Sequence, residues 1–596
     1  LVHLVDGGLY PYEPDVGSAY PVTGEPLPAA GLYPAVALSG LALYRGEAFP
    51  SEMRGNLFSA QHNARKLERH ILLRTGSTFS IENHEFITSD DPDFHPSDVL
   101  EAADGSLLIV DTGGWYVQHC PTGKIRDSRA PGGIYRVRFR GLAPVPDPLG
   151  LQIQWPTVSA RQLTRFLEDP RPAVRDRAQR TLATRGGDAL ESLKYLLESP
   201  AKNYAKEHAL WVLAAIPKTA ALLELRRALT NTTPDLAVIA ARALGLRADR
   251  DAASVLGAVL AASDPSVRLA AAEALARCGD TSSLPAVWQA LSEVQPDRFL
   301  EHALIHTAYC VADRPALEEA LRHPNSRVQK AALLLLDQPP HRSLSHHFVL
   351  DRITAVDAGL RQTALQILLR HPEWAPQAIG FVKDLALAGR QDGDDRAGLC
   401  SLILAFQFNA EVQQLLGGIL SEPDRAISAE RYLFLLETLA QTSLPRLPVP
   451  WIDALRSAIR HSSPAVRLQA ARLAGLWRIP ALDETLLRVA DDEGVSQELR
   501  LEALRAAIPR HPGLSPLAFS FLLKQLNSES APLSRLTAAE VLSRAQLNDR
   551  EITPLLSALR TNTLVSPSVM LPALLGARDV NILAVFEYLS QAMRHG

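Results

Sequence analysis

The chain has 596 residues, of which 61 are lysine or arginine and 65 are aspartate or glutamate, so its formal net charge is −4. A chain this close to neutral lacks the excess of positive charge with which nucleic-acid-binding proteins hold phosphates. Its composition, 47% hydrophobic and 21% charged, is that of a folded protein and excludes a largely disordered one. We therefore expect no nucleic-acid partner.

The cysteines and the apolar segments exclude further classes. Four cysteines without a CxxC pair predict neither a disulfide framework, nor structural zinc, nor covalent haem. Three of them lie among apolar neighbours in helical segments and are expected to be buried: Cys278, Cys310 and Cys400. No run of about 18 apolar residues occurs, which predicts no membrane span. The sequence begins at Leu1 without a leader pattern, and we expect that a part of the protein lies upstream.

Residues 1–140 predict short antiparallel strands. The pair Asp104-Gly105 lies between two β-rich runs, which is a strong hairpin signal because glycine accepts a positive φ. A further run at 134–139 alternates apolar and basic residues. Four more runs precede the hairpin: Ala37–Tyr44, Asn56–Gln61, Leu67–Leu73 and Phe79–Ile87. These runs indicate about two four-stranded units at the spacing of β-propeller blades.

A change in composition follows at residues 141–156. The prolines of this stretch lack the N–H donors that a helix or an interior strand needs, so it is predicted to be a linker. Residues 157–596 are rich in alanine, leucine and arginine and have a helical period. The predicted domains are therefore 1–140, the linker 141–156, and a helical domain 157–596.

The helical domain repeats. Four helix starts combine a turn, a proline, a core valine and an arginine, and their valines are 93, 61 and 138 residues apart: Val174, Val267, Val328 and Val466. These distances are multiples of about 30 to 35 residues, which indicates a solenoid. Apolar residues follow Val267 at helical spacing, so Ala271 is predicted to be buried and Glu273 to be exposed. The recurring arginines are predicted to pair with aspartates near the turns: Arg175, Arg268 and Arg467.

The segment Asp264–Leu275 resembles the HEAT-repeat consensus, and residues 157–596 as a whole resemble a HEAT array of about a dozen helix pairs. The resemblance implies an extended concave surface that binds a protein partner. The predicted fold is therefore mainly α, a HEAT-type α-solenoid (superhelix) preceded by a partial antiparallel β-propeller.

Residues 31–140 resemble the final blades of a propeller of the sorbosone dehydrogenase-like and soluble quinoprotein glucose dehydrogenase group. The stretches that carry this resemblance are 39–44, 54–58, 96–100, 104–107 and 132–137. Such a propeller has about six blades. With only about two, the first sheet is expected to expose a hydrophobic face, so that residues 1–140 alone would associate. The group is bacterial and periplasmic or secreted, and a c-type cytochrome partner or domain often accompanies it.

The same resemblance points to candidate site residues: His62, Asn63 and Arg65 for catalysis, and His95 and Asp98 for cofactor binding. Quinone-binding members carry an Arg-x-Arg pair where this chain has His95 and Ser97, which supply at most one cation. We therefore expect neither pyrroloquinoline quinone nor calcium to bind, although a complete propeller would permit both. The alternative is that all these residues are ordinary turn and hairpin residues.

Two further groups are weaker candidates. Asp111, beside a hairpin, is a possible calcium or substrate ligand, and His119-Cys120 in the following insertion is a possible metal pair. Two functions remain open. The first is a protein-interaction scaffold attached to a dehydrogenase-like propeller remnant, inactive as an enzyme. The second is the C-terminal part of a periplasmic or secreted quinoprotein-type sugar or aldehyde dehydrogenase.

Overall fold

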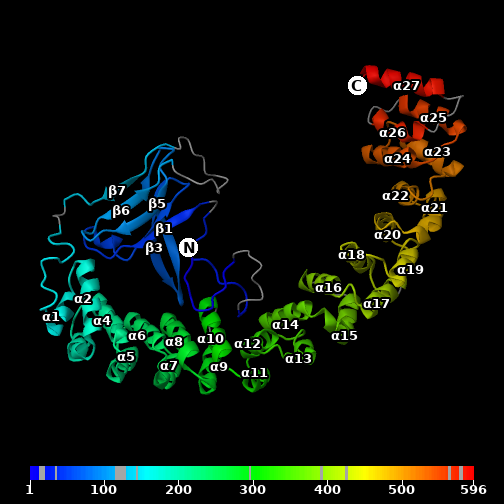
Figure 1. Ribbon diagram of the computed structural model, residues 1–596. Helices are drawn as coiled ribbons and strands as arrows, with labels where there is room; N and C mark the ends of the chain where they lie inside the picture. The colour runs from blue at the N-terminus through cyan, green and yellow to red at the C-terminus, as the bar shows by residue number, and fades with distance from the viewer. Residues whose placement is uncertain are drawn as a thin grey trace. The chain divides into compact units, whose positions relative to one another are not determined.

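The computed structural model describes residues 1–11, 21–33, 36–114, 129–141, 145–293, 297–388, 393–422, 427–560, 565–575 and 582–595 (Figure 1). The chain forms two compact units, Leu1–Phe348 with Arg352–Thr363, and Val349–Asp351 with Ala364–Gly596. No helix among the described residues has both the length and the apolar character that a bilayer crossing requires. The proposed metal pair His119-Cys120 lies outside the described residues.

Two antiparallel sheets form the β-rich part of the first unit. The first has the order β1 (Leu38–Leu43), β2 (Leu57–Gln61), β3 (Lys66–Thr75), β4 (Thr78–Thr88), and the second has the order β5 (Pro96–Glu101), β6 (Leu107–Asp111), β7 (Gly133–Val137). Each predicted run coincides with a strand, and Gly105 at φ 78° closes the predicted hairpin. The second sheet has three strands among the described residues where four were predicted.

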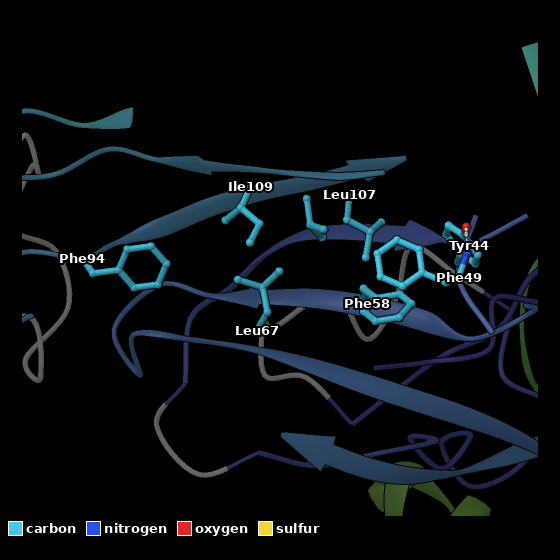
Figure 2. Close-up of a cluster of buried hydrophobic side chains, with 8 residues drawn as sticks. Tyr44, Phe49, Phe58, Leu67, Phe94, Leu107 and Ile109 are labelled. Carbon is cyan, nitrogen blue, oxygen red and sulfur yellow. Dashed lines mark hydrogen bonds between the residues drawn. The ribbon is translucent and has the colours of Figure 1, made fainter. Parts of the chain in front are cut away.

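The two sheets share one hydrophobic core (Figure 2). Its buried residues come from both sheets and from the turns beside them: Tyr44, Phe49, Phe58, Leu67, Phe94, Val99, Leu107 and Ile109. β5 contacts β1 and β2, so the sheets pack face to face. A pair of packed antiparallel sheets is thus established, whereas the blades of a propeller remain a prediction.

The outer face of the first sheet carries both polar and apolar side chains. Its buried positions are polar rather than hydrophobic: Ser59, Gln61, Glu68 and His70. The Tyr33 hydroxyl reaches across this face and donates a hydrogen bond to Asn83 Oδ1 at 3.1 Å. Successive side chains of a strand point to opposite faces, so β2 directs Phe58 into the shared core and its neighbour Ser59 to the outer face. Leu41 and Leu43, which pair with Ser59 and Leu57 on the same face, are 52% and 44% exposed, so the association of residues 1–140 alone stays a prediction.

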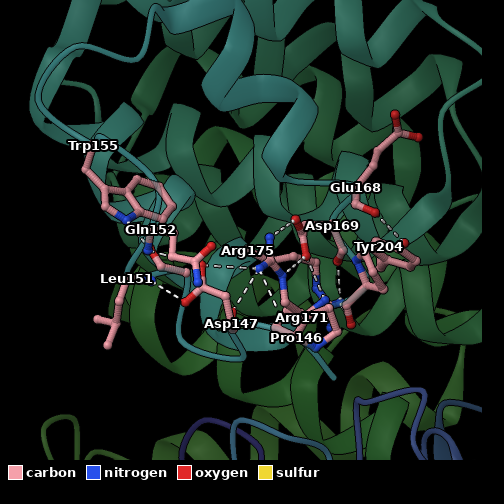
Figure 3. A network of polar contacts seen from close by, with 12 residues as sticks. Pro146, Asp147, Leu151, Gln152, Trp155, Glu168, Asp169, Arg171, Arg175 and Tyr204 are labelled. Atoms are coloured by element: carbon pink, nitrogen blue, oxygen red, sulfur yellow. Dashed lines mark hydrogen bonds and ion pairs between the residues drawn. The ribbon is translucent and has the colours of Figure 1, made fainter. Parts of the chain in front are cut away.

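The linker is ordered where it is described and contains neither helix nor strand, as its prolines predict (Figure 3). Trp155 is buried and its indole N–H donates to the Gly150 carbonyl at 2.8 Å. The Asp147 carboxylate accepts the N–H of Leu151 at 2.7 Å, and Arg171 donates to the Asp147 carbonyl at 2.8 Å. These contacts fix the linker against the start of the helical array.

Helices in the first unit stack in two rows. They are α1 (Ala160–Phe166), α2 (Pro172–Arg185), α3 (Leu190–Glu198), α4 (Asn203–Ala215), α5 (Thr219–Asn231), α6 (Pro234–Leu246), α7 (Ala253–Val259), α8 (Pro265–Cys278), α9 (Leu284–Ser292), α10 (Arg298–Val311), α11 (Arg314–Ala320) and α12 (Ser326–Asp337). Each of α2, α4, α6, α8 and α10 contacts the next. We call these helices, and their equivalents in the second unit, the groove row.

Repeat chemistry explains the stacking. The Asp264 carboxylate caps α8 by accepting the Ser266 N–H at 2.8 Å, and Pro265 occupies the first turn. The predicted stripe that includes Ala271 is buried. Helices α6 and α8 pack so closely that a Cβ on Gly245 would lie 2.9 Å from the Ala274 Cα. Small residues thus permit the close helix contacts of the row.

The recurring arginines are structural, but their partners differ from the prediction. Arg175 donates to the Asp169 carbonyl at 2.8 Å, Arg268 to that of Ala290 at 3.2 Å, and Arg467 to that of Ile459 at 3.2 Å. The partners are main-chain oxygens at helix ends, not aspartate carboxylates. The reason is that the last carbonyls of a helix lack intrahelical donors. The aspartate of the repeat that contains Arg268, Asp264, instead caps the N-terminus of α8.

The second unit continues the array with α15 (Ala375–Leu387), α16 (Gly393–Ala405), α17 (Ala410–Ser421), α18 (Ala429–Leu439), α19 (Val449–Ala458), α20 (Pro464–Leu476), α21 (Asp483–Asp491), α22 (Gln497–Ala507), α23 (Pro516–Gln525), α24 (Pro532–Arg544), α25 (Asp549–Arg560), α26 (Pro567–Leu574) and α27 (Ile582–His595). Helices α13 (His346–Leu350) and α14 (Ala358–Arg370) lie at the boundary. Its groove row is α16, α18, α20, α22, α24 and α26, each in contact with the next.

The cysteines follow the prediction in one case of three. Cys278 is buried, whereas Cys310 is exposed and Cys400 half-buried. Cys310 lies one helical turn after His306, with its Sγ 3.9 Å from Nε2 of that ring. Cys400 lies next to the buried stripe that begins at Leu399 rather than in it.

Candidate protein-binding grooves

The structure brings His62 and His95 together. Their ring centroids are 4.9 Å apart, at the end of β2 and the start of β5. The buried Asp111 carboxylate accepts the His95 N–H at 2.8 Å and the Gly113 N–H at 2.9 Å. His95 Nδ1 donates a hydrogen bond to the Gly113 carbonyl at 2.8 Å. Burial, and then the His95 ring, lower the pKa of His62.

The other predicted site residues support the turns around this pair. Asn63 Oδ1 accepts the Ala37 N–H at 2.7 Å, and Arg65, at φ 55°, donates to the Asp90 carbonyl at 3.4 Å. Asp98 is exposed on β5 and accepts the Val99 N–H at 2.8 Å. The structure therefore unites His62 with His95 and gives Asn63, Arg65 and Asp98 local hydrogen-bonding roles.

These residues do not fit a quinone cofactor. A quinone carboxylate needs cations, but His95 Nδ1 faces main-chain carbonyls and the Ser97 hydroxyl donates to the Val110 carbonyl at 3.3 Å. Asp111 Oδ1 already accepts the N–H groups of His95 and Gly113, and Asp111 Oδ2 accepts a hydrogen bond from the Tyr135 hydroxyl at 3.4 Å. Within the described ranges, His, Cys, Asp and Glu side chains form no cluster of three that would hold a metal ion.

One contact chain on the outer face of the first sheet has the order of a nucleophile, a base and an orienting group. Ser59 Oγ is 2.7 Å from His70 Nε2, and His70 Nδ1 is 2.8 Å from Asn83 Oδ1. Ser59 is 1% exposed and His70 is fully buried, so a substrate cannot reach the hydroxyl. These residues form a polar network that is buried at Ser59 and His70 and ends at the exposed Asn83.

The groove row of the first unit binds an extended stretch of the chain's own N-terminus. We call residues 1–11 and 21–33 the N-terminal segment. The Asp6 N–H donates to Glu273 Oε1 on α8 at 3.2 Å, and its carboxylate pairs with Arg277 at 2.7 Å. The Asp6 carbonyl accepts a hydrogen bond from His302 Nε2 on α10 at 2.8 Å. Main-chain and side-chain groups of one residue are thus held by two groove-row helices.

A second anchor lies further along the segment. The Gln338 side chain, just after α12, accepts the Val22 N–H at 2.6 Å and donates to the Val22 carbonyl at 2.8 Å. Arg298 donates to the Glu25 carbonyl at 2.7 Å. These bonds reach the peptide backbone, so they recognise an extended chain rather than particular side chains.

Shape and burial complete the fit. Gly7 has φ 69°, and a Cβ there would lie 2.5 Å from the His306 ring, so the segment requires glycine at this point. The Thr23 hydroxyl is 2.7 Å from Nδ1 of the buried His302. Since Nε2 of His302 donates to Asp6, Nδ1 accepts, and the ring is neutral. Burial lowers the pKa of His302 to about 4.

The first sheet also lies along this row (Figure 1). At the tip of the β3–β4 hairpin, the Ser77 N–H and hydroxyl both donate to the Asp297 carboxylate at 2.8 Å. Arg74 donates to Ser266 Oγ at 2.9 Å and pairs with Asp235 on α6. The N-terminal segment and the hairpin together cover the groove row from α6 to α10.

The groove row of the second unit is open between α20, α22, α24 and α26. A hollow of about 1220 Å³ follows these helices, and no described residue fills it. Its charged lining consists of five arginines and two glutamates: Arg472, Arg478, Arg505, Arg510, Arg544, Glu502 and Glu540. We call it the open groove.

Charges in the open groove form a ladder. Arg505 on α22 lies 3.2 Å from Glu540 on α24, which also pairs with Arg544 at 3.2 Å. Glu502 lies 4.0 Å from Arg472 on α20 and 3.7 Å from Arg505. The guanidinium groups are about half exposed, whereas Glu502 retains 15% of its side-chain exposure. Burial raises the pKa of the Glu502 carboxyl. The exposed Glu498 pairs with Arg472 at 3.1 Å beside the groove, so the arginines of the lining outnumber their carboxylate partners among the described residues by one.

Family models match two parts of the chain. Residues 219–306, from α5 to α10, match a model of HEAT repeats. The helical array therefore contains HEAT repeats over this range. Residues 30–141, which contain both sheets, match a domain of unknown function, DUF7133. That match gives no support to the resemblance to quinoprotein dehydrogenases. No curated protein matches the chain.

Several solved helical-repeat proteins are similar to this chain. Yeast importin-β (Kap95p) is 11% identical over 68% of this chain and 64% of its own, with a TM-score of 0.30. Kap121p bound to RanGTP is 15% identical over 75% of this chain and 52% of its own, with a TM-score of 0.34. The CpcE–CpcF complex of phycocyanin lyase from Nostoc sp. PCC7120 is 23% identical over 42% of this chain and 93% of its own, with a TM-score of 0.21. The chain spans about half the length of Kap121p.

Proposed function

We propose that this chain is a protein-interaction scaffold whose groove row binds extended polypeptide segments. The observation that carries the proposal is the N-terminal segment, held in the first unit through the main-chain groups of Asp6 and Val22. The second unit has the same row of helices and an open groove of about 1220 Å³. In the first unit the ligand belongs to the chain itself, and in the second unit it comes from a partner.

Physical reasons support this use of a solenoid. Each repeat contacts only its neighbours, so the array presents a long continuous row of side chains to a ligand. A flexible segment bound along such a row gains many small contacts rather than one deep pocket. No membrane or nucleic-acid partner is required. The scaffold and the two packed sheets would act together, because the N-terminal segment and the β3–β4 hairpin tie them to one another.

Selection from an unbiased library of unstructured peptides against the full chain tests the proposal. Ser543, which lines the open groove, is changed to Trp to fill it, and the exposed Asp453 on α19 is changed to Trp as the matched control. We expect selected peptides to lose at least tenfold in affinity for Ser543→Trp and to bind Asp453→Trp normally. Selected peptides that bind both variants equally would overturn the proposal.

A further inference from the structure

The open groove carries more positive charge than its ion pairs use. Arg510 pairs with the buried Asp483, and Arg472 pairs with Glu498 at 3.1 Å as well as with Glu502. Five arginines of the lining therefore meet four carboxylates in the part of the chain that the structure describes, and the exposed side chains are those of Arg472, Arg505 and Arg544. A guanidinium has five N–H donors in a fixed fork. Arg505 directs Nε to Glu540 at 3.2 Å and one terminal nitrogen to Glu502 at 3.7 Å, so donors remain for a ligand. Forks of this kind match carboxylates well.

Spacing along the row suggests a pattern for the ligand. Arg472 and Arg505 lie on α20 and α22, and Arg544 lies on α24, so successive helices each supply one cation. Packed helices are about 8 to 10 Å apart. An extended chain advances about 3.3 Å per residue. Carboxylates about three residues apart would therefore meet successive arginines.

From this charge and spacing we infer that the open groove binds an acidic, extended segment of a partner protein. The inference deepens the proposed function and rests on it. Glu502 and Glu540 lie between the arginines, where a peptide backbone has N–H groups to offer them. The first unit shows this contact, because Glu273 accepts the Asp6 N–H there. A nucleic-acid backbone has no such donor, and its phosphates would meet the two carboxylates.

A direct test uses the full chain and three fluorescent probes. The first is a 13-residue peptide with glutamate at every third position among serine and alanine, the second has glutamine in place of glutamate, and the third is a 12-nucleotide single-stranded DNA. We expect the glutamate peptide to bind at least tenfold more tightly than either other probe, and more weakly as salt is raised. Equal binding of the two peptides, or tighter binding of the DNA, would overturn the inference.

Variants locate the effect. The double variant Arg472→Gln with Arg505→Gln is expected to bind the glutamate peptide at least tenfold more weakly. The double variant Arg472→Lys with Arg505→Lys is expected to retain part of the affinity. Arg456 and Arg488 form exposed ion pairs on α19 and α21, so Arg456→Gln with Arg488→Gln is the matched control and should change nothing. Glutamine variants that bind the glutamate peptide as the unaltered chain does would contradict the inference, provided that their thermal melts show a folded protein. The lysine variants retain the charge and so test binding in a chain whose folding is least disturbed.

The library selection separates the two proposals. If the selected peptides depend on Ser543 but lack acidic residues, the inference about charge fails and the scaffold function stands. If no selected peptide depends on Ser543, the scaffold function itself fails.

Discussion

The two units contain equivalent groove rows, but side chains of opposite charge occupy equivalent positions on them. In both, a core valine is followed six residues later by a charged residue on the groove row: Glu273 after Val267 in the first unit, and Arg472 after Val466 in the second. Glu273 accepts a main-chain N–H of the N-terminal segment, whereas Arg472 lines the open groove. The buried positions thus define the solenoid, and the charged position on its surface defines what each groove binds.

The occupied groove of the first unit and the open groove of the second bind their ligands at different entropic cost. A ligand that belongs to the same chain is present at high effective concentration, so weak contacts suffice to hold it. A single hydrogen bond contributes about 0.5 to 1.5 kcal/mol net, and several join the N-terminal segment to α8, α10 and the end of α12. A ligand from a partner loses translational freedom when it binds. The exposed guanidiniums of the second unit provide charge attraction that would offset this loss.

The largest expected effect tests whether the two cores are equivalent. Ala271 and Ala470 are both fully buried, four residues after the core valines. Ala271→Asp and Ala470→Asp each place an unpaired carboxylate between helices, and we expect each to lower the free energy of unfolding by about 3 to 5 kcal/mol. Denaturant melts measure this loss.

The matched controls for these substitutions are Ala220→Asp and Ala410→Asp, at exposed positions in the first turns of α5 and α17. An acidic residue is favourable near a helix N-terminus, so the controls should change stability by about 0.5 kcal/mol or less. If only one of the two buried substitutions were severe, the cores of the two units would differ.

Acid should release the ligand of the first groove. His302 is neutral in the folded chain, because its pKa is lowered to about 4 by burial, with Arg298 and His306 acting in the same direction. Asp6 opposes this shift. Between pH 6.5 and about 4 the unfolded chain binds a proton that the folded chain does not, so stability rises with pH in this window and falls on acidification. Each unit of pKa shift corresponds to about 1.4 kcal/mol.

We therefore expect the free energy of unfolding of the unaltered chain to fall by about 3 kcal/mol between pH 7 and pH 4 because of His302. His208, whose pKa burial also lowers to about 4, titrates in the same range. The variant His302→Gln removes only the first group, so the difference between the two pH profiles isolates His302. Identical profiles for the two proteins would show that His302 does not anchor the N-terminal segment.

An intermediate effect is expected at Gln338. Gln338→Ala removes both bonds to Val22, and we expect amide hydrogen exchange in residues 21–33 to accelerate about tenfold, which corresponds to about 1.4 kcal/mol. Gln289→Ala on α9, at an exposed position whose side chain donates a hydrogen bond to Glu293, is the control. Exchange that is equally slow in both variants would place the segment's main anchor elsewhere.

Local patterns predicted much of the fold. The strands, the helix starts and the buried stripe around Ala271 depend on residues close in sequence, where periodicity and caps are visible. The occupied groove was not predictable in this way, because its bonds join residues far apart: Asp6 to Glu273 over 267 positions and Val22 to Gln338 over 316. For the same reason Glu273 was predicted to be an ordinary surface residue and Cys310 a buried one.

The candidate site shows the same limit. Sequence singled out His62 and His95, and the structure places their rings 4.9 Å apart. Asp98 accepts the N–H of its neighbour Val99, a local role that the alternative interpretation had allowed. The partner of Asn63, the Ala37 N–H, lies 26 positions away and was not predictable from local spacing. Nor did local spacing reveal the ladder of the open groove, whose members come from three different repeats.

The smallest expected effect compares the equivalent charged positions directly. Glu273→Ala removes an acceptor that the Asp6 N–H uses within a partly covered groove, and we expect it to cost about 1 kcal/mol in unfolding experiments. Arg472→Gln removes an exposed guanidinium whose partners are Glu498 at 3.1 Å and Glu502, and exposed pairs contribute only about 0 to 1 kcal/mol. Arg472→Gln should therefore leave the melting temperature almost unchanged while it weakens the binding of the glutamate peptide. A loss of stability for Arg472→Gln as large as that for Glu273→Ala would mean that the arginine holds the helices together, and that the open groove is part of the architecture rather than a place for a ligand.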